Sequence, residues 1–453
     1  MAGRAHIRGG FNWPGVLLLG VLAWSAAQGK LTDATAPGKP VPLQPLIDRT
    51  PPNGTLRLPP GRYAGPVVID KPMVLDGQGK ATIDAGGKGS VILLKTNGAE
   101  IRNLHLTHSG TSYNDIDAGI QVRGRYNVIQ DNRIDDCLFG IDMQQSDNNI
   151  VRRNYIRSKP FPLGQRGDGI RLWYSFHNRI EDNVLDHVRD MVVWYSANNE
   201  IRRNRSSHSR YSLHFMYSRY NLVENNHYTH NAVGIFLMYS DSVVVRNNTI
   251  AHAVGPSGIG IGFKETSDLT IEGNRILYCA SGMYLDVSPF QPGTTNRITG
   301  NTVAYNAIGM RFLNDWHGNL LHDNNFVDNL TQVAVTGGKT ANHNEWRRNY
   351  WSDYAGFDRN RDGIGDTPYV LRAYADRLWQ DEPYAQFFKG SPMLEVLDYL
   401  QRLAPFSPPR VLVTDAAPRM RPFHWKPARP RPKPQGEPTD ALEILLRSLG
   451  REE

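Results

Sequence analysis

The chain has 453 residues, two cysteines and a formal net charge of +7 at pH 7. This length allows a large core in one or two domains, and two cysteines are too few for a disulfide scaffold. Residues 417–435 hold six basic residues, six prolines and no acidic residue, so much of the excess charge sits in one tail. Because a nucleic-acid-binding protein gathers basic and aromatic residues on a folded face, this distribution argues against that class.

The first predicted element is a secretory signal peptide at residues 1–27. It has a basic segment (4–8), a short apolar run (16–24) and small residues before a cleavage site at Ala27. The apolar run is too short to span a bilayer, and the alternative is a retained N-terminal anchor. Residues 28–50 are predicted to form a linker or an N-terminal cap.

An asparagine then recurs along most of the chain with a period close to 22 residues. Steps between members range from 21 to 29 residues in the series Asn132, Asn154, Asn183, Asn204, Asn226, Asn248, Asn274, Asn301, Asn325 and Asn349. A short strand of the pattern Gly-apolar-x-apolar follows in most repeats, as at Gly234 to Leu237. One such coil cannot bury its apolar face alone, so coils stack about 4.8 Å apart. Asparagines at the same bend can bond to one another as a ladder. We therefore predict an all-β fold, a right-handed parallel β-helix over residues 51–356.

The two cysteines are predicted to be unpaired. Cys137 and Cys279 each lie five residues after a ladder asparagine, in coils six rungs apart. Six rungs separate them by about 30 Å, whereas a disulfide needs Cα atoms within about 7 Å. We expect two buried thiols.

Alternation along the Gly-apolar-x-apolar strands assigns each position to the inside or the outside of the solenoid. Positions two and four are apolar in almost every coil and are predicted to face the core. Position five is then predicted to point outward, and it reads Trp173, Trp194, Met216 and Met238 in four successive coils. A contiguous apolar stripe on an outer face usually marks an interaction site. The alternative is that the strands bend inward here and the stripe belongs to the core.

The same stripe carries a candidate copper site. His214 precedes Met216 by two residues and is predicted to share its face. Thioether sulfur favours Cu(I), and imidazole also binds copper, so His214, Met216 and Met238 could form a three-ligand site. Because methionine also fills irregular packing gaps, a partner-docking surface that includes Trp173 and Trp194 is the other interpretation.

The next coils carry charges at the outward positions, namely Lys264, Glu265, Asp286, Arg311 and Asp315. Mixed charges of this kind are typical of a solvated surface. They could instead bind an acidic saccharide or cleave it, and the chain would then be a polysaccharide lyase or a C5-epimerase with an acid–base pair in a cleft.

An acidic loop follows the last coil. Residues at positions 1, 3, 5 and 9 of a calcium-loop pattern are Asp358, Asn360, Asp362 and Asp366. Tyr369 stands where an EF-hand would place its glutamate, so the loop is not a complete EF-hand. A structural Ca²⁺ site and an Asx turn without metal are the two alternatives.

The C-terminal region is predicted to form a cap and a tail. Apolar residues recur through 381–403, and we predict that residues 357–404 include an amphipathic helix that closes the open end of the solenoid. Residues 405–453 are predicted to form an extended, basic, proline-rich tail.

Several segments resemble the NosD family, periplasmic β-helix proteins associated with maturation of nitrous oxide reductase. They are His214 to Ser218, Leu237 to Ser240, Leu75 to Asp84, Asn349 to Tyr354 and Phe357 to Tyr369. The Tyr-Trp-Ser-Asp-Tyr ending with its acidic loop is the most specific of these, whereas the repeats alone are shared with sugar-processing β-helices. The resemblance covers about residues 40–425, and the basic proline-rich stretch after Met420 departs from the family pattern.

The resemblance implies a periplasmic accessory protein without enzymatic activity. Its partners would be the permease and ATPase of a membrane ABC transporter, a copper chaperone lipoprotein and nitrous oxide reductase, with Cu(I) as a transient cargo. It implies no particular copper ligands, so His214, Met216 and Met238 depend on the strand pattern.

Overall fold

The computed structural model describes residues 39–373, 391–393, 396, 399–400 and 410–426. The predicted signal peptide, most of the predicted cap helix and the end of the tail lie outside these residues. No helix in the described part of the chain is long and apolar enough to cross a membrane.

A short helix covers the start of the solenoid. Strand β1 (Val41–Pro42) leads into helix α1 (Gln44–Arg49), which has a proline in its first turn and buries Ile47 beside Leu43. The Gln44 side chain both donates to and accepts from the backbone of Val68. The described part of residues 28–50 therefore forms an N-terminal cap from β1 onward.

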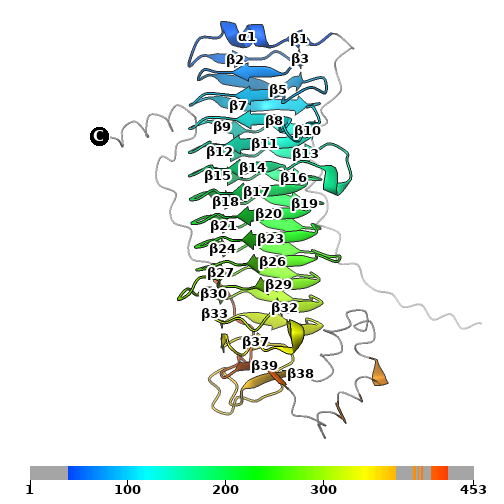
Figure 1. Cartoon of the computed structure of the whole chain (residues 1–453), viewed down its shortest axis with the longest axis vertical. Coiled ribbons are helices and arrows are strands. Elements are labelled where there is room, and N and C mark those ends of the chain that lie inside the picture. Colours follow the sequence, from blue (N-terminus) through cyan, green and yellow to red (C-terminus); the bar gives the residue numbers. More distant parts are fainter. Residues whose placement is uncertain (1–38, 374–390, 394–395, 397–398, 401–409, 427–453) are drawn as a thin grey trace, which may run out of the picture. The chain divides into compact units, whose positions relative to one another are not determined.

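Parallel strands then stack in two sheets (Figure 1). The smaller sheet has twelve strands, which are β4 (Val67–Ile69), β6 (Ile92–Leu94), β8 (Ala118–Val122), β11 (Phe139–Gln144), β14 (Ile170–Trp173), β17 (Asp190–Trp194), β20 (Tyr211–Met216), β23 (Val233–Met238), β26 (Ile259–Lys264), β29 (Ser281–Asp286), β32 (Ile308–Phe312) and β35 (Thr331–Val335).

The larger sheet has 25 strands, two from each regular coil. They are β1, β2 (Thr55–Arg57), β3 (Gly61–Ala64), β5 (Val74–Asp84), β7 (Glu100–Thr107), β9 (Val128–Gln130), β10 (Arg133–Cys137), β12 (Ile150–Arg152), β13 (Tyr155–Ser158), β15 (Arg179–Glu181), β16 (Val184–Asp186), β18 (Glu200–Arg202), β19 (Arg205–Ser207), β21 (Leu222–Glu224), β22 (His227–Thr229), β24 (Val244–Arg246), β25 (Thr249–Ala251), β27 (Thr270–Glu272), β28 (Arg275–Leu277), β30 (Asn296–Thr299), β31 (Thr302–Ala304), β33 (Asn319–His322), β34 (Asn325–Val327), β36 (Glu345–Arg347) and β37 (Tyr350–Trp351). Two short 3₁₀ helices, η1 (Leu163–Gln165) and η2 (Thr336–Gly338), lie in connections. The predicted parallel β-helix is confirmed.

The predicted asparagine ladder is present, with one correction. Each Oδ1 atom accepts hydrogen bonds from the backbone N–H and the Nδ2 of the ladder asparagine one coil earlier, as between Asn226 and Asn248 at 2.9 Å each. The prediction of Asn325 was wrong, because Asn324 bonds in this place to Asn349. The left-handed bend residue Asp323 sets this register, since the ladder residue follows such a bend residue directly.

A second ladder was not predicted. It consists of Asn127, Asn149, Asn178, Asn199 and Asn221 at another bend of the coil, where the backbone N–H of each residue donates to the Oδ1 atom of the next. Both ladders satisfy backbone N–H groups at the bends, where the strands supply no partner. The coil geometry is thereby fixed at two bends.

Both cysteines are buried and unpaired, as predicted. Burial raises the pKa of Cys137 to about 12 and that of Cys279 to about 11. Both thiols therefore stay protonated at neutral pH and act as small apolar side chains.

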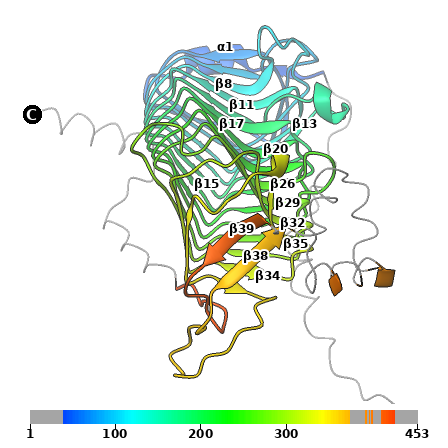
Figure 2. The same ribbon diagram turned by 60° about the horizontal axis from the view of Figure 1, so that its bottom comes forward.

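An antiparallel strand pair closes the far end of the solenoid (Figure 2). Strand β38 (Tyr369–Ala373) pairs with β39 (Arg410–Asp415), and β39 contacts β35 and β36. Asp415 is fully buried and takes the place of the next ladder asparagine, because its Oδ2 atom accepts from the N–H and Nδ2 of Asn349. The described residues within the predicted cap helix, 392–393, 396 and 399–400, are helical and exposed.

Of the predicted tail, residues 410–415 form β39 instead of an extended tail, and residues 419–425 lie along the solenoid. Arg419 forms an ion pair with Asp323, and the Phe423 backbone exchanges hydrogen bonds with the Asn325 side chain. Further back, Trp425 Nε1 donates to Asn247 Oδ1 over 2.7 Å. We call residues 419–425 the strap.

Candidate functional site

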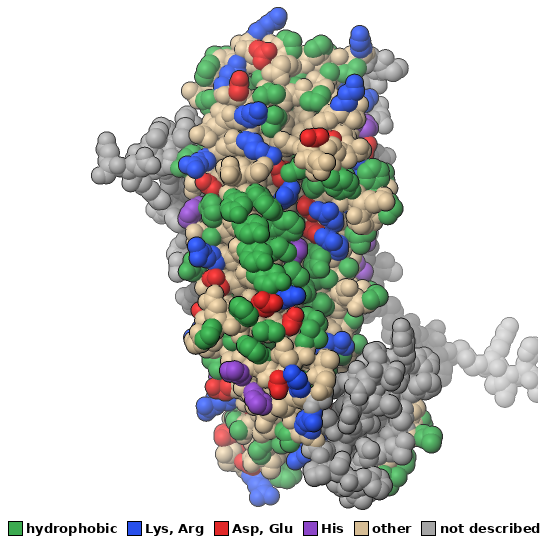
Figure 3. Space-filling model, in the orientation of Figure 1, with side chains coloured by type: hydrophobic (Ala, Val, Ile, Leu, Met, Phe, Trp, Pro, Cys, Tyr) green, Lys and Arg blue, Asp and Glu red, His purple; other side chains and the backbone are tan. Residues whose placement is uncertain are grey.

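The predicted outer stripe lies on the twelve-stranded sheet. Backbone pairing places Trp173 beside Trp194, Trp194 beside Met216, and Met216 beside Met238. All four side chains are partly exposed, and none belongs to the buried core. Figure 3 shows hydrophobic side chains gathered over the middle strands of this sheet. The alternative that the stripe belongs to the core is therefore wrong, because strict alternation turns position five outward.

A tyrosine column borders the stripe. Tyr174, Tyr195, Tyr217 and Tyr239 follow the stripe residues in left-handed conformations with φ between 47° and 50°. Their rings stack at centroid distances of 5.0, 5.1 and 4.8 Å. Together with Trp173, Trp194, Met216 and Met238, these tyrosines form what we call the aromatic face.

His214 borders this face on the side away from the tyrosine column. Its Nε2 atom is 3.4 Å from Met238 Sδ. The ring stacks on Tyr211 at 4.8 Å and meets Trp194 edge-on at 5.7 Å. Although His214 points outward, only 6% of it is exposed, since these neighbours cover it.

Burial sets the protonation state of His214. Desolvation lowers its pKa to about 4, against a smaller opposing effect of Asp190. The ring is therefore neutral at pH 7 and keeps a lone pair for a metal ion. Its Nδ1 atom and the Nε1 atom of Trp194 are both buried with no hydrogen-bond partner among the described residues. The face thus combines soft sulfur, neutral imidazole and unpaired polar atoms.

Buried ion pairs border the same sheet and were not predicted. Arg189 donates two hydrogen bonds to Asp168, at 2.9 and 3.0 Å. Burial raises the pKa of Asp168 to about 6, although Arg189 opposes the shift. The Arg171 guanidinium lies 5.1 Å from the ring centroid of Trp173, so a cation also packs on the aromatic face.

The predicted charged positions continue the outer surface past Met238. Lys264 pairs with Met238 on one side and Asp286 on the other. Arg311 pairs with Tyr284 at position three of the pattern, two positions before Asp286. Lys264 and Asp286 therefore share a column, and Arg311 stands in the neighbouring one.

The acidic loop folds around its own side chains. Asp358 accepts hydrogen bonds from the N–H groups of Asp362 and Gly363, and Asp366 accepts one from Arg359 N–H. Asn360 Oδ1 also accepts from Asp362 N–H. These bonds are those of Asx turns, and they arrange the four predicted oxygen-bearing residues in one loop.

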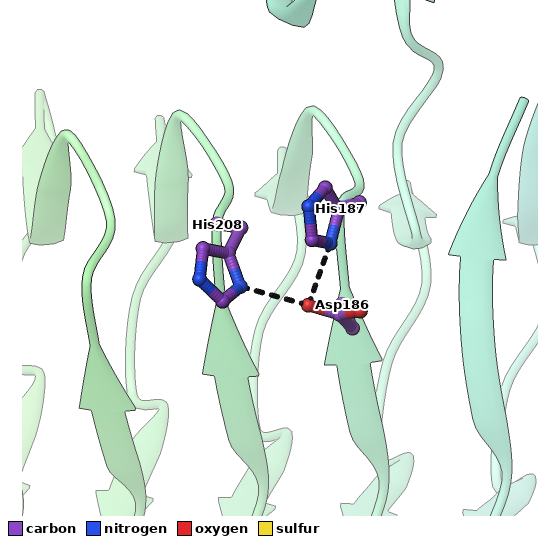
Figure 4. A group of neighbouring side chains, drawn as sticks. All are labelled: Asp186, His187 and His208. Carbon is purple, nitrogen blue, oxygen red and sulfur yellow. Dashed lines mark hydrogen bonds and ion pairs between the residues drawn. The ribbon is translucent and has the colours of Figure 1, made fainter. Parts of the chain in front are cut away.

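A further group of potential metal ligands was missed. In the described part of the chain, the one set of three His, Cys, Asp or Glu residues with ligand atoms all within 4.8 Å is Asp186, His187 and His208 (Figure 4). The signal was available in the sequence, because His187, His208, His230 and His252 recur at 21 or 22 residues, the period of the asparagine ladder.

Comparisons with known proteins point in one direction. The sequence model of a family described as "Periplasmic copper-binding protein (NosD)" matches residues 152–356. Two relatives are each named "Probable ABC transporter binding protein NosD". The one from Pseudomonas aeruginosa is 35% identical over 422 residues, covering 88% of this chain and 94% of that protein. The one from Stutzerimonas stutzeri is 31% identical over 371 residues, covering 77% and 83%.

A solved structure is similar in fold. The A-module of the mannuronan C-5 epimerase AlgE6 from Azotobacter vinelandii has a TM-score of 0.50 at 18% identity, covering 65% of this chain and 90% of that one. At this identity the likeness shows the fold alone.

Proposed function

Because this chain belongs to the NosD family, we propose that it is a periplasmic accessory protein of a copper-processing ABC transporter. In this role it supports assembly of the copper sites of nitrous oxide reductase, by docking partners and by relaying Cu(I). Its partners are the transporter permease and ATPase, a copper chaperone lipoprotein and the reductase. We propose no catalytic activity for the chain, since the relatives are named for binding.

The aromatic face supports the docking role. Tryptophan, tyrosine and methionine are enriched at protein interfaces, and here they form one contiguous surface. The left-handed bends hold the four tyrosines in a stack, so little side-chain entropy is lost on binding.

The contact between His214 and Met238 carries the relay proposal. His214 Nε2 lies 3.4 Å from Met238 Sδ. Met216 is in the coil before Met238 and pairs with it across the sheet. Two thioethers and one neutral imidazole are ligands that Cu(I) prefers. The low pKa of His214 means that no proton competes with the metal at neutral pH. Cu(I) is cargo in this proposal, which it gains from one partner and loses to another.

An anaerobic Cu(I) competition titration against a chromophoric chelator tests the relay. We expect stoichiometric binding by the wild-type chain. Changing His214, Met216 and Met238 together to alanine should weaken it at least a hundredfold. The matched variant Met216→Leu with Met238→Leu keeps the apolar area but removes both sulfurs, and it should lose Cu(I) as well. Equal competition by wild type and variants would refute the ligand assignment.

Docking is tested separately by binding of the chain to the purified transporter. The Met→Leu pair should bind as the wild type does, because the apolar surface is kept. Tyr217→Arg should weaken binding at least tenfold, and the left-handed bend tolerates arginine, as at Arg203. If Tyr217→Arg binds normally, the aromatic face is not the docking surface.

We also propose a structural Ca²⁺ at the loop formed by Asp358, Asn360, Asp362 and Asp366. Carboxylate and amide oxygens are the ligands of Ca²⁺, and the Asx turns already arrange this loop. The ion would hold the loop beside Tyr369, whose hydroxyl donates to Asp353.

A further inference from the structure

A histidine column follows one corner of the solenoid. His187, His208, His230 and His252 occupy the bend after the second strand of the larger sheet in four successive coils, with φ between 54° and 57°. Their rings stack at centroid distances of 4.6, 6.2 and 4.7 Å. The bends repeat, so the rings repeat with them.

One pair in this column differs from the others by a carboxylate. Asp186 Oδ1 lies 2.8 Å from His187 Nδ1 and 3.0 Å from His208 Nδ1 (Figure 4). The position before His230 is Thr229 and the position before His252 is Ala251. The first pair therefore has two imidazoles and one carboxylate oxygen. The second pair has two imidazoles and the Thr229 hydroxyl, 2.9 Å from His230 Nδ1, in place of a carboxylate.

We propose that Asp186, His187 and His208 form a surface site for a divalent transition-metal ion of the Cu²⁺ and Zn²⁺ class. Two imidazoles and a carboxylate are ligands of intermediate hardness. They suit divalent copper and zinc, whereas Cu(I) favours softer sulfur ligands. Affinity for Cu²⁺ is expected to exceed that for Zn²⁺. This site lies on a different corner from the aromatic face, has different ligand chemistry, and does not depend on the proposed Cu(I) relay.

The distances are close to those that a metal requires. Metal bonds of about 2.0–2.2 Å in tetrahedral geometry place two ligand atoms about 3.3 Å apart. The observed 2.8 and 3.0 Å separations must open by a few tenths of an ångström. The side chains are 20%, 34% and 54% exposed, so they have room to turn, and a turn of the His187 ring exposes its Nδ1 atom, which is buried, to an ion. Ser207 Oγ donates to Asp186 Oδ1 and orients the carboxylate.

Metal binding also requires a defined proton movement. In the metal-free site an Nδ1–H group can donate to the carboxylate. On binding, each Nδ1 gives its lone pair to the metal, and its proton moves through solvent to Nε2 of the same ring. Both rings bind the ion in their neutral form, and the Asp186 carboxylate balances part of its charge.

Titration of the metal-free full-length chain with Cu²⁺ and with Zn²⁺, each alone, tests the proposal. We expect Cu²⁺ binding with an electron paramagnetic resonance spectrum that shows coupling to imidazole nitrogen. The double change His187→Asn with His208→Asn should weaken this binding at least a hundredfold, and Asp186→Asn at least tenfold. Asparagine is chosen because it tolerates the left-handed conformation of these positions.

The matched control is His230→Asn with His252→Asn, which removes an equally stacked pair that lacks the carboxylate. We expect this control to bind Cu²⁺ as the wild type does. The proposal is overturned if the first double variant binds as tightly as the control variant, or if both lose binding equally. Thermal unfolding of each variant verifies folding. Cu(I) titration of the first double variant should match that of the wild type, which separates this site from the proposed relay.

Discussion

Asp415 should determine how firmly the last coils of the solenoid are held. Its Oδ2 atom accepts from the N–H and Nδ2 of Asn349 at 2.9 Å each and from Trp351 Nε1 at 3.2 Å. Its Oδ1 atom accepts from Arg348 N–H and Ala417 N–H, both at 3.1 Å. Asn349 and Trp351 are almost completely buried, so bulk water does not reach their N–H groups in the folded chain.

Two substitutions separate the contributions of these bonds. Asp415→Ala leaves three buried donors unpaired, each costing about 1–3 kcal/mol, and since such costs are not additive we expect a loss of about 4 kcal/mol. Asp415→Asn keeps one oxygen for Asn349 and Trp351, as each ladder asparagine does for the coil before it. Its amide nitrogen would face the two other N–H groups, so we expect a loss of about 2 kcal/mol.

Hydrogen exchange measured by peptide is the suitable assay, because stability in a solenoid depends mainly on neighbouring coils. Protection should fall in β33, β34, β36 and β37 and stay unchanged in β8 to β17. The reasoning is refuted if Asp415→Asn is as damaging as Asp415→Ala, or if neither change lowers protection of the last coils by more than about 1 kcal/mol.

Three further predictions follow from individual contacts. Cu(I) affinity should stay constant between pH 7.5 and 5.5, because the pKa of His214 is lowered to about 4. A histidine with a pKa of about 6.5 would lose affinity about tenfold over this range, and such a loss would contradict the burial of His214. Ca²⁺ should slow amide exchange in the acidic loop at least tenfold, and Asp358→Asn should abolish this protection; an equal effect in both proteins would argue against the site. Gly300 is in the left-handed conformation, and a Cβ atom there would collide with Trp425. Gly300→Asn should therefore raise amide exchange in the strap as much as Trp425→Ala does. Unchanged amide exchange in the strap would show that the Trp425 ring does not hold it.

The sequence determines the features that repeat. A constant period and strict alternation are local properties, so they predicted the coils, the buried thiols and the outward position of Trp173, Trp194, Met216 and Met238. The histidine column repeats with the same period, so its stacking could also have been predicted from the sequence. The exchange of Asn325 for Asn324 shows the limit of this reasoning, since two adjacent asparagines fit the period equally and the left-handed bend at Asp323 decides between them.

Only the tertiary structure decided how non-repeating parts meet the coils. The closing strand brings Asp415 to Asn349 across 66 residues, and the strap brings Trp425 to Asn247 across 178. Alternation placed His214 outside, but its burial comes from Tyr211 and Trp194, which lean over it. Each of these contacts depends on the packing of a particular side chain against another segment, and sequence spacing does not specify the direction in which a side chain leans or the path of an irregular connection.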